Sequence, residues 1–281
     1  MEEAPSPSSQ SPPQGRWAGR DTNKDQVRSE IWQRLETDGW NIGPTWSHIP
    51  NFVGADTAAW RLAQTTEWKQ ARTIKCNPDP PQIPVRLRAL YGGKVLYAPV
   101  PYLTKEFPYL RIDPDVMLDE GVSFELAATS EGFVTHGERI GFEDVEPLDF
   151  CVVGSVAVSR RGGRTGKGAG FADLETGIFR ELGIIKTHTP MATTIHSCQL
   201  VDDARVFMMP HDSPLDYVAT EAELIVTGNT TSRPTGVSWD SVRQDQFDTI
   251  PFLRDLCRRM QSGVLTTRTA SIKYQVGGGT T

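Results

Sequence analysis

The chain has 281 residues, of which 38% are hydrophobic, and a formal net charge of −6. This length allows one large α/β domain or two small ones, and the negative charge excludes a globally basic surface for nucleic acid. Four scattered cysteines without a C-x-x-C pair argue against a disulfide framework or a structural zinc site. No apolar run could span a bilayer, and the N-terminus lacks an apolar signal core. We therefore expect a cytoplasmic protein that contacts neither nucleic acid nor membrane.

The composition divides the chain into three parts. Residues 2–15 are mostly Pro, Ser, Gln and Glu, which bury too little apolar surface to become ordered. We therefore predict a disordered tail over 1–20 and one α/β domain over 21–262. Residues 263–281 form a C-terminal extension that could hold one strand before a flexible, glycine-rich end.

The first half of the domain is predicted to alternate between helices and strands. Asp21 or Thr22 can cap the first helix, on which Ile31, Trp32 and Leu35 share one face. The predicted elements are a helix over 24–37, a helix beginning at 54–56, a strand over 73–76, a helix over 84–90 and a strand over 94–100.

The second half continues this alternation after a mixed segment. The most apolar stretch, residues 150–158, predicts a strand in the middle of the sheet. The remaining predicted elements are a helix over 174–182, strands over 191–200 and 217–226, and a helix over 250–260. This pattern predicts an α/β fold with an open Rossmann-like sheet, helices on both faces, and ligands at the carboxyl ends of the strands.

A basic glycine-rich loop, residues 162–173 (GGRTGKGAGFAD), follows the predicted central strand. Glycines let backbone N–H groups approach phosphate oxygens closely, and the helix that follows adds a partial positive charge. Arg164 and Lys167 add full charges, and Asp173 could hold a divalent metal against the same phosphates. The loop matches neither G-x-x-x-x-G-K-[ST] nor G-x-G-x-x-G. Taken alone, it is explained equally well as a flexible hairpin with solvated charges.

Residues 163–173 resemble the G-x-R-x-G-x-G-x-G-Y-x-D loop of 5-formyltetrahydrofolate cyclo-ligases, also called methenyltetrahydrofolate synthetases. Lys24-x-x-x-Arg28 is similar to the N-terminal Lys/Arg pair of that family, and Pro210-His211-Asp212, followed by Asp216, is similar to its late acidic motif. Residues 49–55, 75–79 and 154–158 (IPNFVGA, KCNPD and GSVAV) resemble the branch known as methenyltetrahydrofolate-synthetase-domain proteins. The resemblance extends over roughly 24–256.

This resemblance implies an open Rossmann-like fold and a reaction that depends on ATP and Mg²⁺. The formyl oxygen of 5-formyltetrahydrofolate would attack the γ-phosphoryl group, and a neighbouring nitrogen would then close the ring to 5,10-methenyltetrahydrofolate. Phosphoryl transfer of this kind depends on positioning and charge stabilisation, so no nucleophilic side chain is required.

The resemblance also assigns roles to individual residues. Lys24 and Arg28 would reach the nucleotide phosphates, and Arg164 and Lys167 would neutralise them during catalysis. The residues that would wrap the triphosphate or border the ligand are Gly166, Gly168, Gly170 and Phe171, and the two Mg²⁺ ligands would be Asp173 and Asp212.

Several of these residues also have a structural interpretation. Lys24 and Arg28 could form a solvated helix face, Asp173 could be an ordinary acid at a helix N-terminus, and His211-Asp212 could lie in a solvated turn. Glu175 and Glu181 are interpreted as surface charges of the helix.

One departure from the family loop concerns the substrate. Phe171-Ala172 stands where an aromatic pair with tyrosine before the acid is usual, so a stacking face is kept and a hydroxyl is lost. Three hypotheses follow: a folate cyclo-ligase, an ATP-dependent cyclase or amide-activating enzyme acting on another small molecule, and a non-catalytic nucleotide-binding protein. The sequence gives no indication of the oligomeric state.

Overall fold

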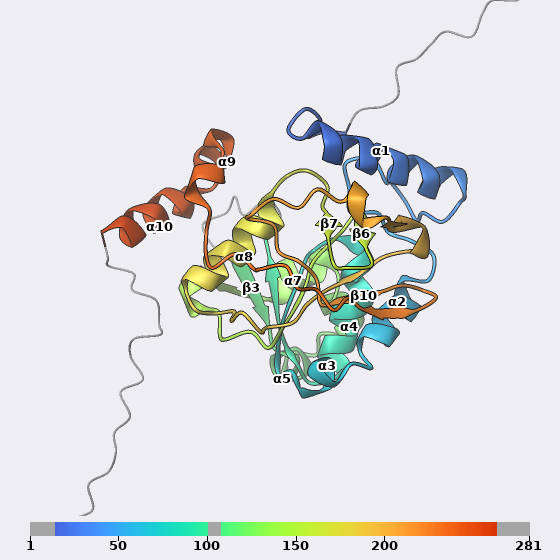
Figure 1. Cartoon of the computed structure of the whole chain (residues 1–281). Coiled ribbons are helices and arrows are strands. Elements are labelled where there is room, and N and C mark those ends of the chain that lie inside the picture. Colours follow the sequence, from blue (N-terminus) through green and yellow to red (C-terminus); the bar gives the residue numbers. More distant parts are fainter. Residues whose placement is uncertain (1–14, 101–107, 263–281) are drawn as a thin grey trace, which may run out of the picture.

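The computed structural model describes residues 15–100 and 108–262, which form a mixed α/β fold around one large sheet (Figure 1). The sheet has eight strands in the order β11-β10-β8-β5-β1-β2-β3-β4. The central strands β10, β8, β5, β1 and β2 pair in parallel, and β11, β3 and β4 are antiparallel strands at the edges. The strand bounds are β1 Thr73–Cys76, β2 Val95–Pro99, β3 Tyr109–Ile112, β4 Glu138–Ile140, β5 Phe150–Val152, β8 Met191–Thr194, β10 Tyr217–Ala219 and β11 Leu224–Val226.

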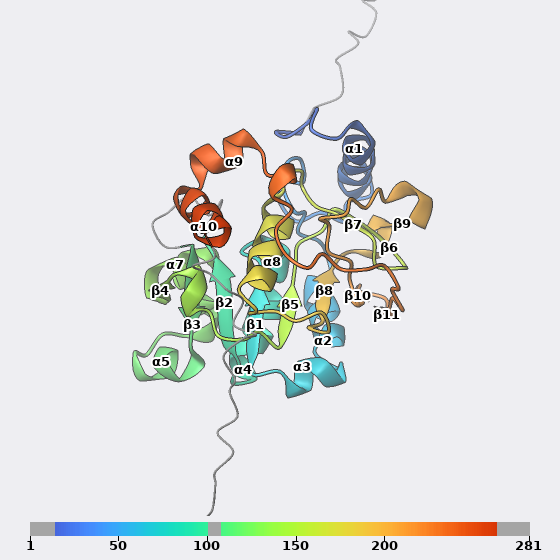
Figure 2. The same cartoon turned by 60° about the vertical axis from the view of Figure 1, so that its left-hand side comes forward.

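Helices cover both faces of this sheet, which confirms the predicted architecture (Figure 2). One face packs against α2 Ala55–Leu62, α3 Thr66–Gln70, α4 Ile83–Tyr91, α5 Pro114–Asp119, α6 Phe124–Ala127 and α7 Ser130–His136. The other face packs against α8 Phe171–Glu181, α9 Gln244–Thr249 and α10 Pro251–Gln261. Two separate apolar layers therefore enclose the sheet.

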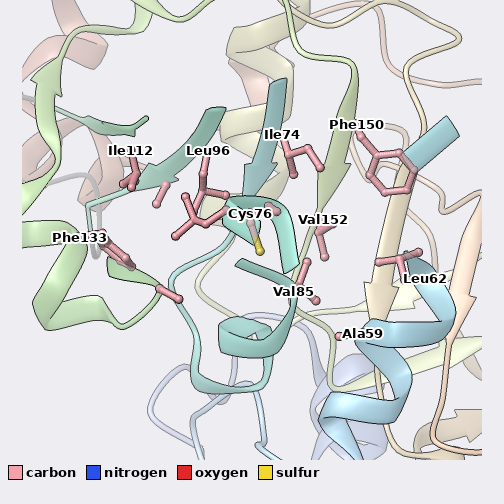
Figure 3. Close-up of a cluster of buried hydrophobic side chains, with 14 of the residues drawn as sticks. Ala59, Leu62, Ile74, Cys76, Val85, Leu96, Ile112, Phe133, Phe150 and Val152 are labelled. Atoms are coloured by element: carbon pink, nitrogen blue, oxygen red, sulfur yellow. The ribbon is translucent and has the colours of Figure 1, made fainter. Parts of the chain in front are cut away.

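Strand β5 shows how the sequence supplies both layers. Successive side chains of a strand point to opposite faces. Phe150 and Val152 belong to the cluster drawn in Figure 3, together with residues of α2, α4 and α7. Cys151 lies in the opposite cluster with Phe179 of α8. The sequence of a strand that is buried on both faces in this way is a continuous run of apolar residues.

Three predicted strands are wrong in extent, because apolar runs do not show where the chain leaves a sheet. The run 150–158 contains β5 and a separate strand, β6 (Ala157–Ser159), that belongs to a second sheet. The run 191–200 contains β8, a 3-10 turn and the start of β9 (Leu200–Val201). The run 217–226 is a hairpin of β10 and β11, because the Thr220 hydroxyl accepts hydrogen bonds from the amides of Ala222 and Glu223.

The second sheet, with the strand order β7-β6-β9, supports the first helix and the glycine-rich loop. Its third strand, β7, is Arg164–Thr165, so the loop follows directly from it. Helix α1 (Thr22–Thr37) begins as predicted, with Asp21 accepting a hydrogen bond from the amide of Lys24. Val27, Ile31, Trp32 and Leu35 pack against this sheet, which fixes the position of the polar side of α1.

The two predicted chain ends are described only in part. Residues 15–20, which the composition placed in the N-terminal tail, contact the fold: the amide of Arg16 donates to Ser47 Oγ, and the amide of Gly19 donates to Asp25 Oδ2. Residues 1–14 and the predicted extension 263–281 lie outside the described residues. Over the described ranges, no helix combines the length and the apolarity that a membrane span requires.

Candidate functional site

A cavity of about 480 Å³ lies at the carboxyl ends of the central strands, as predicted for this kind of sheet. Asn77 and Asp79 follow β1, Val100 follows β2 and Gly154 follows β5, and all four line the cavity. The structure also brings all the predicted site residues to its wall, namely Lys24, Arg28, Arg164, Gly166, Lys167, Gly168, Gly170, Phe171, Asp173 and Asp212.

The glycine-rich loop has the backbone geometry of an anion site. Gly168 and Gly170 have φ of +103° and +76°, a conformation that glycine adopts readily, and Gly170 also forms the N-cap of α8. No hydrogen bond from the amides of Lys167 to Gly170 is formed within the described parts of the chain. Unpaired amides beside a helix N-terminus form an anion-binding arrangement.

Helix α1 places two cations, Arg28 and Lys24, at the cavity wall. The Arg28 guanidinium donates from Nε to the carbonyl of Gly166 at 2.7 Å and pairs with Asp25 at 2.6 Å. Burial lowers the pKa of Arg28, although Asp25 opposes this effect. Lys24 Nζ lies 2.6 Å from Asp212 Oδ2, and both side chains are nearly buried. The solvated helix face that was the alternative interpretation of these two residues is therefore wrong.

Asp173 and Asp212 lie next to each other at the cavity wall. Asp173 Oδ1 accepts a hydrogen bond from the amide of Ser213, the residue that follows Asp212. Asp212 Oδ2 accepts from the amide of Met209 as well as from Lys24, so Asp212 is buried, whereas Met209 is exposed and His211 is partly exposed. The solvated-turn interpretation is therefore wrong for Asp212 only. Asp216, the last residue of the same motif, points elsewhere and pairs with Arg233.

Arg164 forms an internal ion pair with the first of these carboxylates. Its Nη2 lies 2.6 Å from Asp173 Oδ2, and Nη1 donates to the carbonyl of Gly154. Burial by itself would lower the pKa of Arg164, but the carboxylates of Asp173, Asp212 and Glu175 together outweigh burial and raise it. Burial would raise the pKa of Asp173, but the Arg164 charge and the Ser213 amide hold that pKa below its usual value. The buried Nε of Arg164 has no hydrogen-bond partner among the described residues.

The sequence interpretation missed several residues of the cavity. Asp79 pairs with Lys167 at 2.8 Å, although the segment containing it was used only as a mark of resemblance. Glu175 is buried and pairs with Lys75 of β1, so its interpretation as a surface charge is wrong. The helical spacing of Glu175 with the buried Phe179 could have indicated this.

A stretch near the C-terminus forms a further wall that no motif predicted. We call it the C-terminal wall, and its members are Gly236, Val237, Ser238, Ser241, Val242, Arg243 and Gln246. The amide of Val237 donates to Glu181 Oε1 of α8 at 3.0 Å, which holds the wall against that helix. Serine, amide and guanidinium groups therefore line the cavity on this side, and Arg243 donates to the carbonyl of Ala169 in the glycine-rich loop.

The model of the 5-formyltetrahydrofolate cyclo-ligase family matches residues 20–221. The chain belongs to this family. It is 36% identical over 237 residues to a bovine "methenyltetrahydrofolate synthase domain-containing protein", an alignment that covers 83% of this chain and 62% of the bovine protein. The mouse protein of the same name is 37% identical over 240 residues, covering 84% of this chain and 64% of its own length. The chain thus spans less than two thirds of these relatives.

Solved structures of the cyclo-ligase family are more distant. The NMR structure of Aquifex aeolicus 5,10-methenyltetrahydrofolate synthetase is 18% identical, with a TM-score of 0.46 over 74% of this chain and 95% of the other. The relatives named above confirm the branch that the segments 49–55, 75–79 and 154–158 indicated. The departure from the family loop, Phe171-Ala172, lies at the start of α8, where both residues line the cavity.

The donor set of the cavity fits Mg²⁺ held jointly with phosphates. Mg²⁺ is usually bound by one or two carboxylates together with phosphate oxygens and water. Asp173 and Asp212 supply two adjacent carboxylates at the end of the glycine-rich loop. Over the described residues, no group of three or more His, Cys, Asp or Glu side chains forms a metal cage.

Proposed function

We propose that this chain is a cyclo-ligase that uses ATP and Mg²⁺ to convert 5-formyltetrahydrofolate, or a closely related N-formyl compound, into a ring-closed product. The observation that carries the proposal is the set of groups that line one cavity. The cavity joins the unpaired loop amides, the cations Lys24, Arg28 and Lys167, and the carboxylates Asp173 and Asp212. Loop amides and cations suit a triphosphate, and adjacent carboxylates suit its metal ion.

In this reaction the protein supplies position and charge. The formyl oxygen attacks the γ-phosphorus, and ADP leaves with the electrons of the broken P–O bond. The neighbouring nitrogen then attacks the formyl carbon and loses its proton, and phosphate departs. Mg²⁺, when bound, would neutralise charge on the phosphates. Lys167 and the loop amides would stabilise the charge that moves onto the leaving oxygen.

The ion pairs at the cavity wall must change partners when nucleotide binds. Lys24 is paired with Asp212, and Lys167 with Asp79. A triphosphate offers each ammonium group several oxygens of higher charge, so we propose that both lysines transfer to phosphate. The carboxylate of Asp212 is then free to bind the metal ion. The carboxylate of Asp79 is then free to bind a ligand in the rest of the cavity.

The test is ATP turnover by the purified chain, with and without 5-formyltetrahydrofolate. Formation of methenyltetrahydrofolate is followed by its absorbance, and ADP is measured separately. We expect both products in equal amounts and only with Mg²⁺. ATP binding without turnover of any formyl substrate would contradict the proposal and favour a non-catalytic nucleotide-binding protein.

The departure at Phe171-Ala172 favours a second candidate, an enzyme of the same chemistry that acts on a non-folate N-formyl or amide compound. Ala172 lines the cavity without a hydrogen-bonding group. A missing partner for a buried polar substrate atom costs about 1–3 kcal/mol. Strong ADP formation with another N-formyl compound, and weak formation with the folate, would select this candidate.

A further inference from the structure

The backbone of the glycine-rich loop is held from the side of its carbonyl groups. Arg28 of α1 donates to the carbonyl of Gly166 at 2.7 Å. Arg243 of the C-terminal wall donates from Nη2 to the carbonyl of Ala169 at 3.0 Å. Arg20, just before α1, donates to the carbonyls of Gly168 at 3.3 Å and Ala169 at 3.4 Å. Three guanidinium groups from different parts of the chain therefore meet on one short loop.

Asp245 of α9 joins two of these arginines. Its Oδ2 lies 2.6 Å from Arg20 Nη2, and its Oδ1 lies 2.9 Å from Arg243 Nε. Burial and the nearby Arg243 charge lower the pKa of Arg20, while Asp245 opposes both. The shared carboxylate thus lets two like charges act on the same stretch of backbone. In Figures 1 and 2, α1 and α9 lie at the same end of the molecule.

These contacts matter because an unsupported glycine-rich loop would be costly to order. Glycine has more backbone freedom than any other residue, and fixing a backbone costs about 1–2 kcal/mol per residue. Carbonyl oxygens carry partial negative charge and would repel a phosphate. The guanidinium groups bind the carbonyls of Gly166, Gly168 and Ala169, while the amides of Lys167 to Gly170 make no hydrogen bond within the described residues.

Two members of this arrangement, Arg243 and Asp245, lie outside the residues that the family model matches. The family model ends at residue 221. Close packing places this segment: a Cβ on Gly177 of α8 would lie 3.1 Å from the carbonyl oxygen of Gly236, and a Cβ on Gly236 would lie 2.2 Å from Glu181 Oε1. The C-terminal wall and α8 are therefore in close contact at these two glycines.

We propose that Arg243, with Arg20 and Asp245, is a positioning device that preorganises the glycine-rich loop for phosphate. Arg243 acts through the loop carbonyl and is a positioning residue. The role in nucleotide binding rests on the proposed function, whereas the effect on the loop does not. Preorganised donors avoid the cost of reorganisation when charge develops, which is why their positions affect both affinity and rate.

The test measures the loop and the nucleotide separately. Hydrogen exchange of the loop amides, residues 163–173, is followed by mass spectrometry without nucleotide, and affinity for ATP with Mg²⁺ is measured by calorimetry. We expect Arg243→Ala to speed exchange of the loop and to weaken ATP binding about tenfold, with a small change in melting temperature. Arg243→Lys should also speed loop exchange and weaken ATP binding, because an ammonium group cannot bridge Ala169 and Asp245 as a planar guanidinium group does. Arg20→Ala should have a smaller effect, because its bonds to the loop are longer.

Arg233→Ala is the matched control. Arg233 also donates to two carbonyls, those of Thr187 and Thr189, and pairs with a carboxylate, but it does not line the cavity. It should leave loop exchange and ATP affinity at the wild-type values. Unchanged loop exchange in Arg243→Ala would overturn the proposal, and if ATP affinity were nevertheless lost, Arg243 would contact the nucleotide directly. A wild-type chain that binds no ATP would overturn the proposed function, while the exchange data would still decide the role of Arg243 in the loop.

Discussion

Two lysines of this chain have carboxylate partners in very different surroundings. The side chain of Lys75 in β1 is 0% exposed and that of its partner Glu175 is 3% exposed. Lys167 in the glycine-rich loop is 25% exposed, and its partner Asp79 is 9% exposed. The first pair joins the sheet to α8 and is almost completely shielded from solvent, and Lys75 Nζ also donates to Asn77 Oδ1. The second lies at an open cavity wall, where a ligand can replace either member, so it can take part in binding.

From this comparison, we expect the largest effect, a loss of stability, when the Lys75–Glu175 pair is broken. Lys75→Met or Glu175→Leu alone should lower the free energy of unfolding by about 3–5 kcal/mol, because each leaves a buried charge without its partner. The double variant Lys75→Met/Glu175→Leu should recover most of this loss, since two apolar side chains can replace a buried pair. Urea denaturation measures all three. A double variant as unstable as the sum of the single variants would show that the pair is not the dominant interaction of either residue.

Substitutions in the Lys167–Asp79 pair should change the affinity for ATP and leave the free energy of unfolding nearly constant. Lys167→Ala should weaken binding of ATP with Mg²⁺ by about 1.5–3 kcal/mol, roughly tenfold to a hundredfold, because a charged donor to phosphate is lost. Asp79→Asn removes the competing carboxylate, so it should bind ATP as tightly as the wild type or more tightly. Calorimetry of both variants gives the affinities. Equal losses in the two variants would mean that the ion pair itself, and not its exchange, supports the site.

The sequence identified the cations of the cavity better than the buried Lys75–Glu175 pair. Lys24, Arg28 and Lys167 lie in short motifs whose order along the chain carried the resemblance, and the structure brings them to one cavity. Lys75 begins the segment 75–79, which was used only as a mark of resemblance, and Glu175 was interpreted as a surface charge, so neither was assigned a partner. Each is a charged residue within a regular element, and only the packing of α8 on the sheet shows that they meet.

Long-range contacts also limited the prediction of the fold. The run 150–158 is apolar throughout because the chain stays buried after it leaves the large sheet, so hydrophobicity could not locate the end of β5. Gly154 allows that exit, since a Cβ there would lie 2.8 Å from Ile49 Cγ1. Arg243 was not predicted because its partners, Ala169 and Asp245, are brought together only by the folded C-terminal segment.

A third prediction concerns how Ala172, at the cavity, affects the affinity for the substrate. Ala172→Tyr adds an aromatic face and a hydroxyl at a residue that lines the cavity. If the substrate is a folate, its apparent affinity should improve about fivefold, which corresponds to about 1 kcal/mol, with little change in melting temperature. Ala172→Phe is the control, because it supplies the ring without the hydroxyl. The absorbance assay for methenyltetrahydrofolate measures both. Efficient wild-type turnover without improvement in either variant would remove the case for a divergent substrate.

The smallest effect is expected from the buried His196, and it concerns the pH dependence of stability. Its ring stacks on Trp40 and its Nδ1 accepts a hydrogen bond from the amide of Cys198. Burial lowers the pKa of His196 from 6.5, although Glu221 and Asp38 oppose this shift.

The direction of the pH effect follows from that shift. The unfolded chain takes up the proton first as pH falls through about 6.5, so the stability linked to His196 is fully present above that pH and is lost below it. His196→Asn keeps a side-chain acceptor for Cys198 but cannot titrate. The difference in melting temperature between wild type and His196→Asn should therefore narrow as pH falls from about 7.5 to 5.5, an effect smaller than the three above. His211→Asn, at a more exposed histidine, serves as the comparison. A difference between wild type and His196→Asn that stays constant over this range would show that the ring contributes through packing alone, as an uncharged part of the fixed interior.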